Sequence, residues 1–306
     1  MSPPAAVSQS PATPRRRKHR DDTKIALLFI LPATIGLLVF LIWPLITGIY
    51  YSFTEYDVLT PPKWTGLSNY SQMLGDPVFW NAIWVTVEYV LINIGVQTVL
   101  ALVIAVLMHR LTQSTWLRSI ILAPYLVSNV VVALIFLWML DAQLGIVNMA
   151  IEALGFNAVQ FWSDSNLAIP TIALVNVWRH MGYTALLLFA GLQAIPDNLY
   201  EAARTDGATE TQMFFRITLP LLRPILALVL IMSIIGSFQV FDTVSVATQG
   251  GPVNASRVLQ MYIYDKAFGQ FEFGYASALS VALLIVLMVI TFFQYRITRA
   301  GKTDLD

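Results

Sequence analysis

The chain has 306 residues, of which 57% are hydrophobic and only 12% are charged, and its formal net charge is zero. This balance is far from that of a soluble domain and indicates an integral membrane protein. A chain without net charge suggests no nucleic-acid partner, and the absence of cysteine excludes disulfides and thiolate metal sites.

Six apolar segments are long enough to cross a bilayer as helices, which takes about 20 residues each. They are residues 25–51, 83–108, 119–140, 169–192, 222–247 and 275–295. Each segment is continuously apolar rather than alternating, which favours helices over the strands of a barrel. The predicted fold is therefore an all-α membrane protein with six transmembrane helices.

The segments outside the predicted spans are short or polar. Residues 1–22 are rich in Pro, Ser, Ala and Arg, which predicts a disordered basic tail. The first apolar segment is too long for the core of a secretory signal, and no convincing cleavage site follows it. We therefore expect a membrane domain over residues 23–300 and a second short tail over 301–306.

Lys and Arg residues are distributed unequally between the two sides of the predicted membrane domain. The side that holds both termini and the connection after the fourth span carries 14 of them, and the other side carries 3. Because cytoplasmic loops are enriched in Lys and Arg, both termini and this connection are predicted to be cytoplasmic.

The connection at residues 196–220 has the pattern of two short helices. Pro196 and Asp197 are typical of a helix start, and Asp206-Gly207 is a turn signal. Thr209 and Gln212 have the spacing of a capping box, which predicts a second helix that ends at Pro220. The segment is longer than a connection requires. Its residues alone leave open whether it rests on lipid headgroups or docks on another protein.

Four ionisable residues fall within the predicted spans: Glu88, Arg179, His180 and Asp242. Charges at this depth are costly and mark either helix contacts or a polar pathway. Arg179 and His180 could join span four to a neighbouring span or contact a substrate. A stand-alone ion-coupled secondary transporter would use all four as a proton or ion relay, although no repeat of the three-plus-three kind is evident.

The sequence offers no assembled catalytic site. Gly301, Lys302 and Thr303 match the end of a phosphate-binding loop, but Arg296 stands where its first glycine would be. The three histidines are scattered, and no serine elbow is present. We therefore expect no catalytic residues, no metal site and no enzymatic activity in this chain.

The cytoplasmic connection resembles the EAA loop of bacterial ABC importer permeases. The matching residues are Glu201, Ala202, Ala203, Gly207, Ala208, Phe215, Ile217, Leu219, Pro220 and Pro224. Three further segments, at residues 66–80, 241–252 and 273–286, resemble the carbohydrate-uptake branch of these binding-protein-dependent permeases. The similarity extends over residues 25–297.

The resemblance implies that this loop is a coupling helix on which a separate ATPase docks. The coupling residues are then Glu201, Ala202, Ala203, Asp206, Gly207 and Ala208. ATP and Mg would bind to an ATPase dimer, and this chain would bind no cofactor. The other implied partners are a second related permease and an extracytoplasmic binding protein, in the cytoplasmic membrane of a bacterium or archaeon. The implied cargo is a sugar or a sugar-like polar solute.

The substrate-binding positions of such permeases can be transferred by spacing. They fall on Asn176, His180 and Tyr183 in the fourth span, and on Ser233, Ser237, Val240, Phe241 and Asp242 in the fifth. Asn176, His180 and Tyr183 are expected on one face of the fourth span. Ser233, Ser237, Val240 and Phe241 are expected to form one stripe on the fifth, with Asp242 turned aside. We expect Tyr183 and Phe241 to stack on the cargo and Asn176 and Ser237 to bind its hydroxyls. Helix packing is the alternative for several of them, and the partner permease is another candidate for the cargo site.

Overall fold

The computed structural model describes residues 20–111 and 114–298. Most of the predicted N-terminal tail and the whole of the tail at 301–306 lie outside the described residues. The chain forms two compact units, residues 1–50 and 51–306, and each is described by itself.

The first unit is one apolar helix with a π-helical turn in its middle. It consists of α1 (Arg20–Leu37), η1 (Leu38–Ile42) and α2 (Trp43–Tyr51). The stretch from Ala26 to Tyr51 is long and apolar enough to cross a membrane, in agreement with the first predicted span. The helix begins at Arg20, inside the segment predicted as a tail.

The second unit is built around long apolar helices. They are α4 (Pro77–Leu111), α8 (Ala168–Leu192), α11 (Leu219–Phe238) and α14 (Phe273–Thr298). Among the described residues of the whole chain, five helical stretches are long and apolar enough to cross a membrane, and a bent pair makes a sixth. The predicted all-α fold with transmembrane helices is therefore confirmed.

The third predicted span is not a single helix. It consists of α5 (Thr115–Leu126) and α6 (Asn129–Met139), which meet at 89°. Pro124 has no backbone N–H to donate within the last turn of α5, and Val127 and Ser128 are both extended. These features explain why the chain changes direction here, where the polar residues Ser128 and Asn129 interrupt the apolar segment.

The fifth predicted span begins earlier and ends earlier than expected. The helix after the turn, α10 (Glu210–Met213), continues through η2 (Phe214–Thr218) into α11, so the prediction that it ends at Pro220 is wrong. Pro220 lies in the first turn of α11, directly after the π-helical turn η2. The π-helical hydrogen-bond pattern accommodates the missing N–H of the proline, so the helix continues through it. At the other end, α11 stops at Phe238, and α12 (Asp242–Ala247) starts after an irregular segment.

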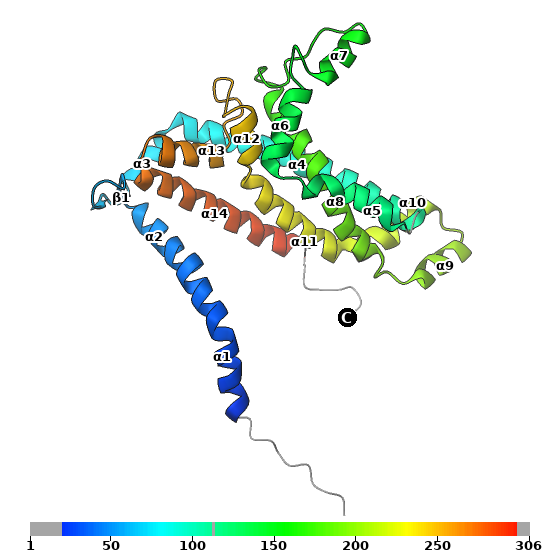
Figure 1. Ribbon diagram of the computed structural model, residues 1–306. Helices are drawn as coiled ribbons and strands as arrows, with labels where there is room; N and C mark the ends of the chain where they lie inside the picture. The colour runs from blue at the N-terminus through cyan, green and yellow to red at the C-terminus, as the bar shows by residue number, and fades with distance from the viewer. Residues whose placement is uncertain (1–19, 112–113, 299–306) are drawn as a thin grey trace, which may run out of the picture. The chain divides into compact units, whose positions relative to one another are not determined.

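Two hydrophobic clusters lie along the same three helices. In the ribbon diagram α4 and α8 run side by side, and both also pack against α11 (Figure 1). One cluster holds the first half of α4 with Ile169 and Phe238, and the other holds Ala101, Leu188 and Leu222. The middle of the three helices, between these clusters, is where polar side chains gather.

Shorter elements complete the second unit together with α9 (Asp197–Thr205). They are β1 (Thr54–Glu55) paired antiparallel with β2 (Lys63–Trp64), then α3 (Ser68–Gly75), α7 (Ile146–Ala153), α13 (Leu259–Tyr264) and η3 (Asp265–Gly269). Figure 1 places α3 and α13 beside the start of α14.

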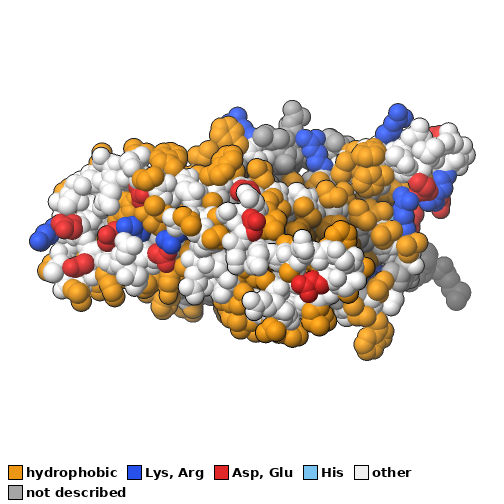
Figure 2. All heavy atoms as spheres, turned by 90° about the horizontal axis from the view of Figure 1, so that it is seen from above, with side chains coloured by type: hydrophobic (Ala, Val, Ile, Leu, Met, Phe, Trp, Pro, Cys, Tyr) orange, Lys and Arg blue, Asp and Glu red, His pale blue; other side chains and the backbone are white. Residues whose placement is uncertain are grey.

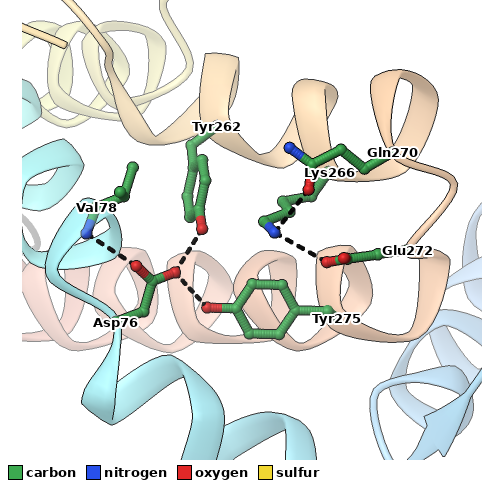
Figure 3. Close-up of polar contacts among 7 residues, drawn as sticks. All are labelled: Asp76, Val78, Tyr262, Lys266, Gln270, Glu272 and Tyr275. Carbon is green, nitrogen blue, oxygen red and sulfur yellow. Dashed lines mark hydrogen bonds and ion pairs between the residues drawn. The ribbon is translucent and has the colours of Figure 1, made fainter. Parts of the chain in front are cut away.

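Asp76, between α3 and α4, connects these outer elements to the bundle. Its carboxylate accepts hydrogen bonds from the hydroxyls of Tyr262 and Tyr275 and from the backbone N–H of Val78 (Figure 3). Burial alone would raise the pKa of Asp76, but these hydrogen bonds to the charged form outweigh it and lower the pKa below its ordinary value. Burial and the nearby carboxylate raise the pKa of Tyr262.

A second polar group lies beside Asp76. Lys266 donates to Gln270 and Glu272, at 2.8 and 2.9 Å from their oxygens, and its ammonium lies 5.3 Å from the centre of the Tyr275 ring (Figure 3). Lys266 thus joins η3 to residues 270–272 by charge-assisted hydrogen bonds and to α14 by its contact with the Tyr275 ring.

Hydrophobic side chains cover much of the face shown in Figure 2. At its right-hand end, where Figure 1 places α9 and α10, basic and acidic side chains lie together. Arg110 at the end of α4 and Glu210 on α10 form an ion pair, with charged atoms 2.6 Å apart. Charged side chains also lie at the left-hand end of this face and near its centre (Figure 2).

Candidate functional site

A cavity of about 560 Å³, with polar, aromatic and apolar side chains in its wall, lies in the second unit between α4, α5, α8 and α11. Its polar and aromatic lining consists of Tyr89, Asn93, Gln97, Tyr125, Asn129, Arg179, His180, Tyr183, Thr184, Ser233 and Ser237. Leu187, Leu228, Val229 and Met232 complete the wall with Gly236. The volume falls within the usual range for small-molecule sites.

Hydrogen bonds connect the three long helices at the cavity wall. The amide nitrogen of Asn93 on α4 donates to the hydroxyl of Ser237 on α11 at 2.9 Å. The amide nitrogen of Gln97, one turn further on, donates to the hydroxyl of Thr184 on α8 at 2.8 Å. All four side chains are buried. This network holds polar groups at fixed positions deep between the helices.

Asn93 has unused hydrogen-bonding capacity. Its side chain is only 5% exposed, and its carbonyl oxygen has no donor among the described residues. A buried acceptor without a donor is costly, and a bound hydroxyl would satisfy it. This oxygen has almost no exposed surface, so a cargo hydroxyl reaches it only when the neighbouring side chains move apart.

Two tyrosines form an aromatic part of the wall. The rings of Tyr125 on α5 and Tyr183 on α8 stack with centroids 4.4 Å apart and 10° between their planes. Tyr183 is 39% exposed. An aromatic surface next to fixed hydrogen-bonding groups suits a molecule with hydroxyls and an apolar ring face.

Arg179 and His180 lie at the end of the cavity where α5 breaks. The guanidinium of Arg179 donates to the backbone oxygens of Val127 at 2.9 Å and Tyr125 at 3.1 Å, and to Nε2 of His180 at 2.8 Å. Because a guanidinium only donates, Nε2 of His180 accepts, so Nδ1 carries the proton and donates to the backbone oxygen of Asn176. His180 is therefore neutral in this arrangement.

The structure brings together four of the eight side chains expected to bind cargo. His180, Tyr183, Ser233 and Ser237 line the cavity. Asn176 does not; its amide donates to the backbone of Ile172, and its oxygen accepts from Thr243 of α12. Of the three residues predicted to share one face of α8, His180 and Tyr183 therefore reach the cavity and Asn176 does not.

The other three expected residues lie beyond the end of α11. The prediction that Ser233, Ser237, Val240 and Phe241 form one helical stripe is wrong, because the helix stops at Phe238. Val240 is buried in the apolar cluster next to α14, and Phe241 packs against Tyr264 with ring centroids 4.9 Å apart. Asp242 starts α12, where an acidic side chain is favourable, and it accepts a hydrogen bond from Asn129 at 2.7 Å.

Several cavity residues were not expected from the sequence. Asn93 and Gln97 lie one turn apart on α4, and Tyr125 and Asn129 flank the break between α5 and α6. The two amides inside a long apolar segment were a usable signal, because polar side chains at this depth usually contact another helix or a polar path. Asn129, a single amide inside the third predicted span, carried the same signal, whereas Tyr125 carried none.

The four ionisable residues do not form a relay. Within the described part of the chain, no ion pair joins any two of Glu88, Arg179, His180 and Asp242. Arg179 contacts His180 and backbone oxygens, and Asp242 contacts Asn129. Glu88 lies on α4 but not on the cavity wall. This arrangement does not support an ion-coupled transporter.

A second candidate site is the loop that follows α8. Its first helix, α9, ends in a Schellman motif: the N–H of Ala208 donates to the oxygen of Ala203, and the N–H of Gly207 to that of Arg204. Gly207 has φ +79°, a conformation that side-chain-bearing residues disfavour, and open space surrounds it. Glycine is therefore required here by the backbone and not by crowding.

The second half of this loop is fixed to α4. Thr209 and Gln212 form the predicted capping box, with both hydrogen bonds present. Glu210 pairs with Arg110 at the end of α4, 2.6 Å apart. Glu201, Ala202, Asp206 and Gly207 are exposed, and Ala203 and Ala208 are half-buried. The loop presents a small, mostly polar surface beyond the long helices.

In the residues that the structure describes, no group of three His, Asp or Glu side chains is close enough to hold a metal ion. The chemistry of the central cavity therefore has to be derived from its amides, hydroxyls, aromatic rings and single guanidinium.

Comparison with known protein families gives a match over residues 97–301, to the family described as binding-protein-dependent transport system inner membrane component. These residues include the cavity-lining parts of α8 and α11 and the whole loop between them.

Individual relatives cover nearly the whole chain. It is 34% identical over 281 residues to the sulfoquinovosyl glycerol transport system permease protein of Agrobacterium fabrum, covering 91% of each chain. It is 33% identical to the trehalose/maltose transport system permease protein of Thermococcus litoralis, covering 92% of this chain and 96% of the relative.

The fold is also similar to a solved structure, that of a bacterial ABC transporter involved in the import of the acidic polysaccharide alginate. The TM-score is 0.81 at 25% identity, with 93% of this chain and 97% of the other covered.

Proposed function

The chain belongs to the family of binding-protein-dependent transport system inner membrane components and is a membrane-spanning permease subunit of an ABC importer. From this premise we propose that it forms half of the membrane path through which a carbohydrate is imported. ATP hydrolysis belongs to a separate subunit, so the chain is not itself an enzyme. The single observation that carries the proposed cargo is the polar and aromatic cavity between α4, α8 and α11.

The cavity has the chemistry that a carbohydrate requires. Asn93, Gln97, Ser233 and Ser237 provide amides and hydroxyls, and the Tyr125–Tyr183 stack provides an aromatic wall. The names of two relatives, from Agrobacterium fabrum and Thermococcus litoralis, describe transport of sulfoquinovosyl glycerol and of trehalose or maltose. Both cargoes are carbohydrates, which supports the same class for this chain.

We assign cargo contact to His180, Tyr183, Ser233 and Ser237, and we add Asn93 and Tyr125. Their positions on the cavity wall support this assignment. Asn176, Val240, Phe241 and Asp242 are assigned to packing around the segment between α11 and α12. Asp242 is hydrogen-bonded to Asn129 of α6 and Asn176 to Thr243 of α12, while Phe241 packs on Tyr264 of α13 and Val240 lies in the apolar cluster. Compared with the residues expected from the sequence, the proposed cargo contacts thus include residues of α4 and α5 in place of those beyond the end of α11.

The loop at residues 196–220 is proposed as the docking element for the ATPase dimer, which would bind ATP and Mg. The EAA motif is typical of this family, and the exposure of Glu201, Ala202, Asp206 and Gly207 supports contact with another protein. The uneven distribution of Lys and Arg supports a cytoplasmic location for this loop and for both termini. The proposed boundaries, with a membrane domain at residues 23–300 between tails at 1–22 and 301–306, rest on composition.

The complex would also contain a second, related permease and an extracytoplasmic binding protein, in the cytoplasmic membrane. A solved alginate transporter, to which this fold is similar, is described in complex with its pentasaccharide-bound periplasmic protein. That description supports the same type of partner here.

The test is uptake into proteoliposomes that contain this chain, its partner permease, the ATPase and the binding protein. Radiolabelled trehalose, maltose and sulfoquinovosyl glycerol serve as probes. We expect uptake of at least one of them to require ATP and to persist when ionophores dissipate ion gradients. ATP-dependent uptake of an amino acid, with none of the carbohydrates transported, would contradict the proposed cargo class.

A further inference from the structure

The break between α5 and α6 leaves backbone oxygens without helical partners. The last carbonyl groups of any helix lack an intrahelical donor, and in an apolar environment no water replaces it. At this break two such oxygens, those of Tyr125 and Val127, accept hydrogen bonds from one side chain on a different helix, Arg179.

Arg179 reaches both oxygens because its guanidinium is a planar fork. Nε donates to Val127 and one terminal nitrogen donates to Tyr125, while the other terminal nitrogen donates to His180. The guanidinium carbon also lies 5.3 Å from the centre of the Tyr125 ring. The cation thus holds the backbone and the ring of the same tyrosine.

The surface of α8 around Arg179 is shaped to fit α5. A Cβ atom at Gly182 would lie 1.9 Å from the backbone oxygen of Ile121, so only glycine permits this approach. Tyr183 follows directly and stacks on Tyr125. Arg179, Gly182 and Tyr183 lie at i, i+3 and i+4 and so share one face of the helix.

We propose that Arg179 is a positioning residue: it holds the break between α5 and α6, and through the break it keeps Tyr125 stacked on Tyr183 in the cavity wall. The functional part of this proposal rests on the proposed role of the cavity in cargo binding. The structural part, that Arg179 fixes the angle between α5 and α6, is independent of any cargo.

Distance measurement tests the structural part first. The chain has no cysteine, so spin labels can be attached at cysteines substituted for Trp116 on α5 and Leu134 on α6, which are 81% and 53% exposed. The complex is assembled with cysteine-free partner subunits and measured without cargo. We expect a narrow distance distribution with Arg179, a broad or shifted one in Arg179→Gln, and an intermediate one in Arg179→Lys, which keeps the charge but not the fork.

Arg118→Gln is the matched control. Arg118 also connects α5 to α8, with its guanidinium 4.4 Å above the ring of Phe189, but it lies away from the break. We expect the distance distribution of Arg118→Gln to remain narrow. Broadening of equal size in both variants would show that any lost α5–α8 contact loosens the pair, and would overturn the specific role of Arg179.

Uptake against cargo concentration tests the functional part. For Arg179→Gln we expect half-saturation to rise by about tenfold or more, with partial rescue in Arg179→Lys, as for the loss of ~1.4 kcal/mol of binding. A raised half-saturation with an unchanged distance distribution would make Arg179 a direct cargo ligand and overturn the proposal. Unchanged results in both measurements would also overturn it, as would failure of both variants to assemble, which would assign Arg179 to folding.

The test separates the two proposals. If no carbohydrate is transported but the distance distribution still depends on Arg179, the proposed cargo class fails and the positioning role stands. If carbohydrate is transported and neither quantity depends on Arg179, only the positioning role fails.

Discussion

The phenol rings of Tyr125 and Tyr183 stack face to face across two helices, with centroids 4.4 Å apart and planes inclined by 10°. Neither ring is covered by the apolar clusters, and both line the central cavity. The pair therefore forms a rigid wall whose area depends on both residues.

This relationship predicts different effects for two substitutions of Tyr183. Tyr183→Phe keeps the stack, whereas Tyr183→Ala removes an interaction worth roughly 0.5–1.5 kcal/mol beyond its buried area. We expect half-saturation of uptake to rise clearly in Tyr183→Ala and to change much less in Tyr183→Phe. Equal half-saturation in the alanine variant and the wild type would exclude a role for the stack in cargo binding.

Ser237 and Ser280 form a matched pair for testing the cavity. Ser237 accepts a hydrogen bond from Asn93 on the cavity wall, whereas Ser280 on α14 donates to its own helix at the Ala276 oxygen. Removal of a partner in a buried network costs about 1–3 kcal/mol. We expect Ser237→Ala to raise half-saturation several-fold or more and Ser280→Ala to leave it unchanged. The measurement is initial uptake rate against cargo concentration, and equal effects would indicate a packing role for Ser237.

Gly207 tests the loop after α8. Its φ of +79° makes Gly207→Ala unfavourable by about 1–2 kcal/mol, although nothing is crowded there. We expect this variant to lower cargo-stimulated ATP hydrolysis at every cargo concentration, without changing half-saturation.

Gly95→Ala on α4 provides the control for Gly207→Ala, because Gly95 is also uncrowded but lies within a helix. We expect Gly95→Ala to be tolerated, since alanine is the better helix former. Wild-type levels of cargo-stimulated ATP hydrolysis in Gly207→Ala would contradict the proposal that this loop docks on the ATPase.

The low pKa of Asp76 predicts a pH-dependent contribution to stability. Since its pKa is lower in the folded chain than the ordinary 3.8, its carboxylate stabilises the fold above that pH, and the contribution is lost as pH falls through the folded value. Tyr262→Phe removes one hydrogen-bond donor to the Asp76 carboxylate and should bring the pKa of Asp76 in the folded chain closer to its ordinary value.

Thermal unfolding of the purified complex at different pH values checks this expectation. The loss of stability in Tyr262→Phe should be present above about pH 3.8 and shrink below it. Tyr264→Phe, whose ring stacks near Phe241 and Phe268, is the control. A deficit for Tyr262→Phe that persists in full at acid pH would show that the hydroxyl acts independently of the Asp76 charge.

Most of the helices could be predicted from the sequence, because long apolar segments have few alternatives in a membrane. Spans such as 169–192 and 275–295 agree with α8 and α14 to within a few residues. The capping box at Thr209 and Gln212 was also predictable, because both partners lie within one turn of each other.

The cavity was only partly predictable, because its walls depend on where helices stop. The end of α11 at Phe238 and the break after Leu126 are marked only by short polar interruptions, Gln239 and Ser128-Asn129, inside long apolar segments. Phe241 and Asn129, which follow those points, therefore lie elsewhere than they would if the helices continued. The role of Arg179 depends on carbonyl groups that exist as free acceptors only because of the break.

The central claim, that the cavity between α4, α8 and α11 holds the cargo, is tested most directly by protection of a cysteine in its wall. Because the chain has no cysteine, Ser233→Cys places a single thiol in the cavity and Ser280→Cys places one on α14 outside it. The rate of maleimide labelling is measured in the assembled complex with and without whichever of trehalose, maltose and sulfoquinovosyl glycerol it transports. We predict that the cargo slows labelling of Ser233→Cys and not of Ser280→Cys; equal labelling of Ser233→Cys with and without saturating cargo would contradict the account.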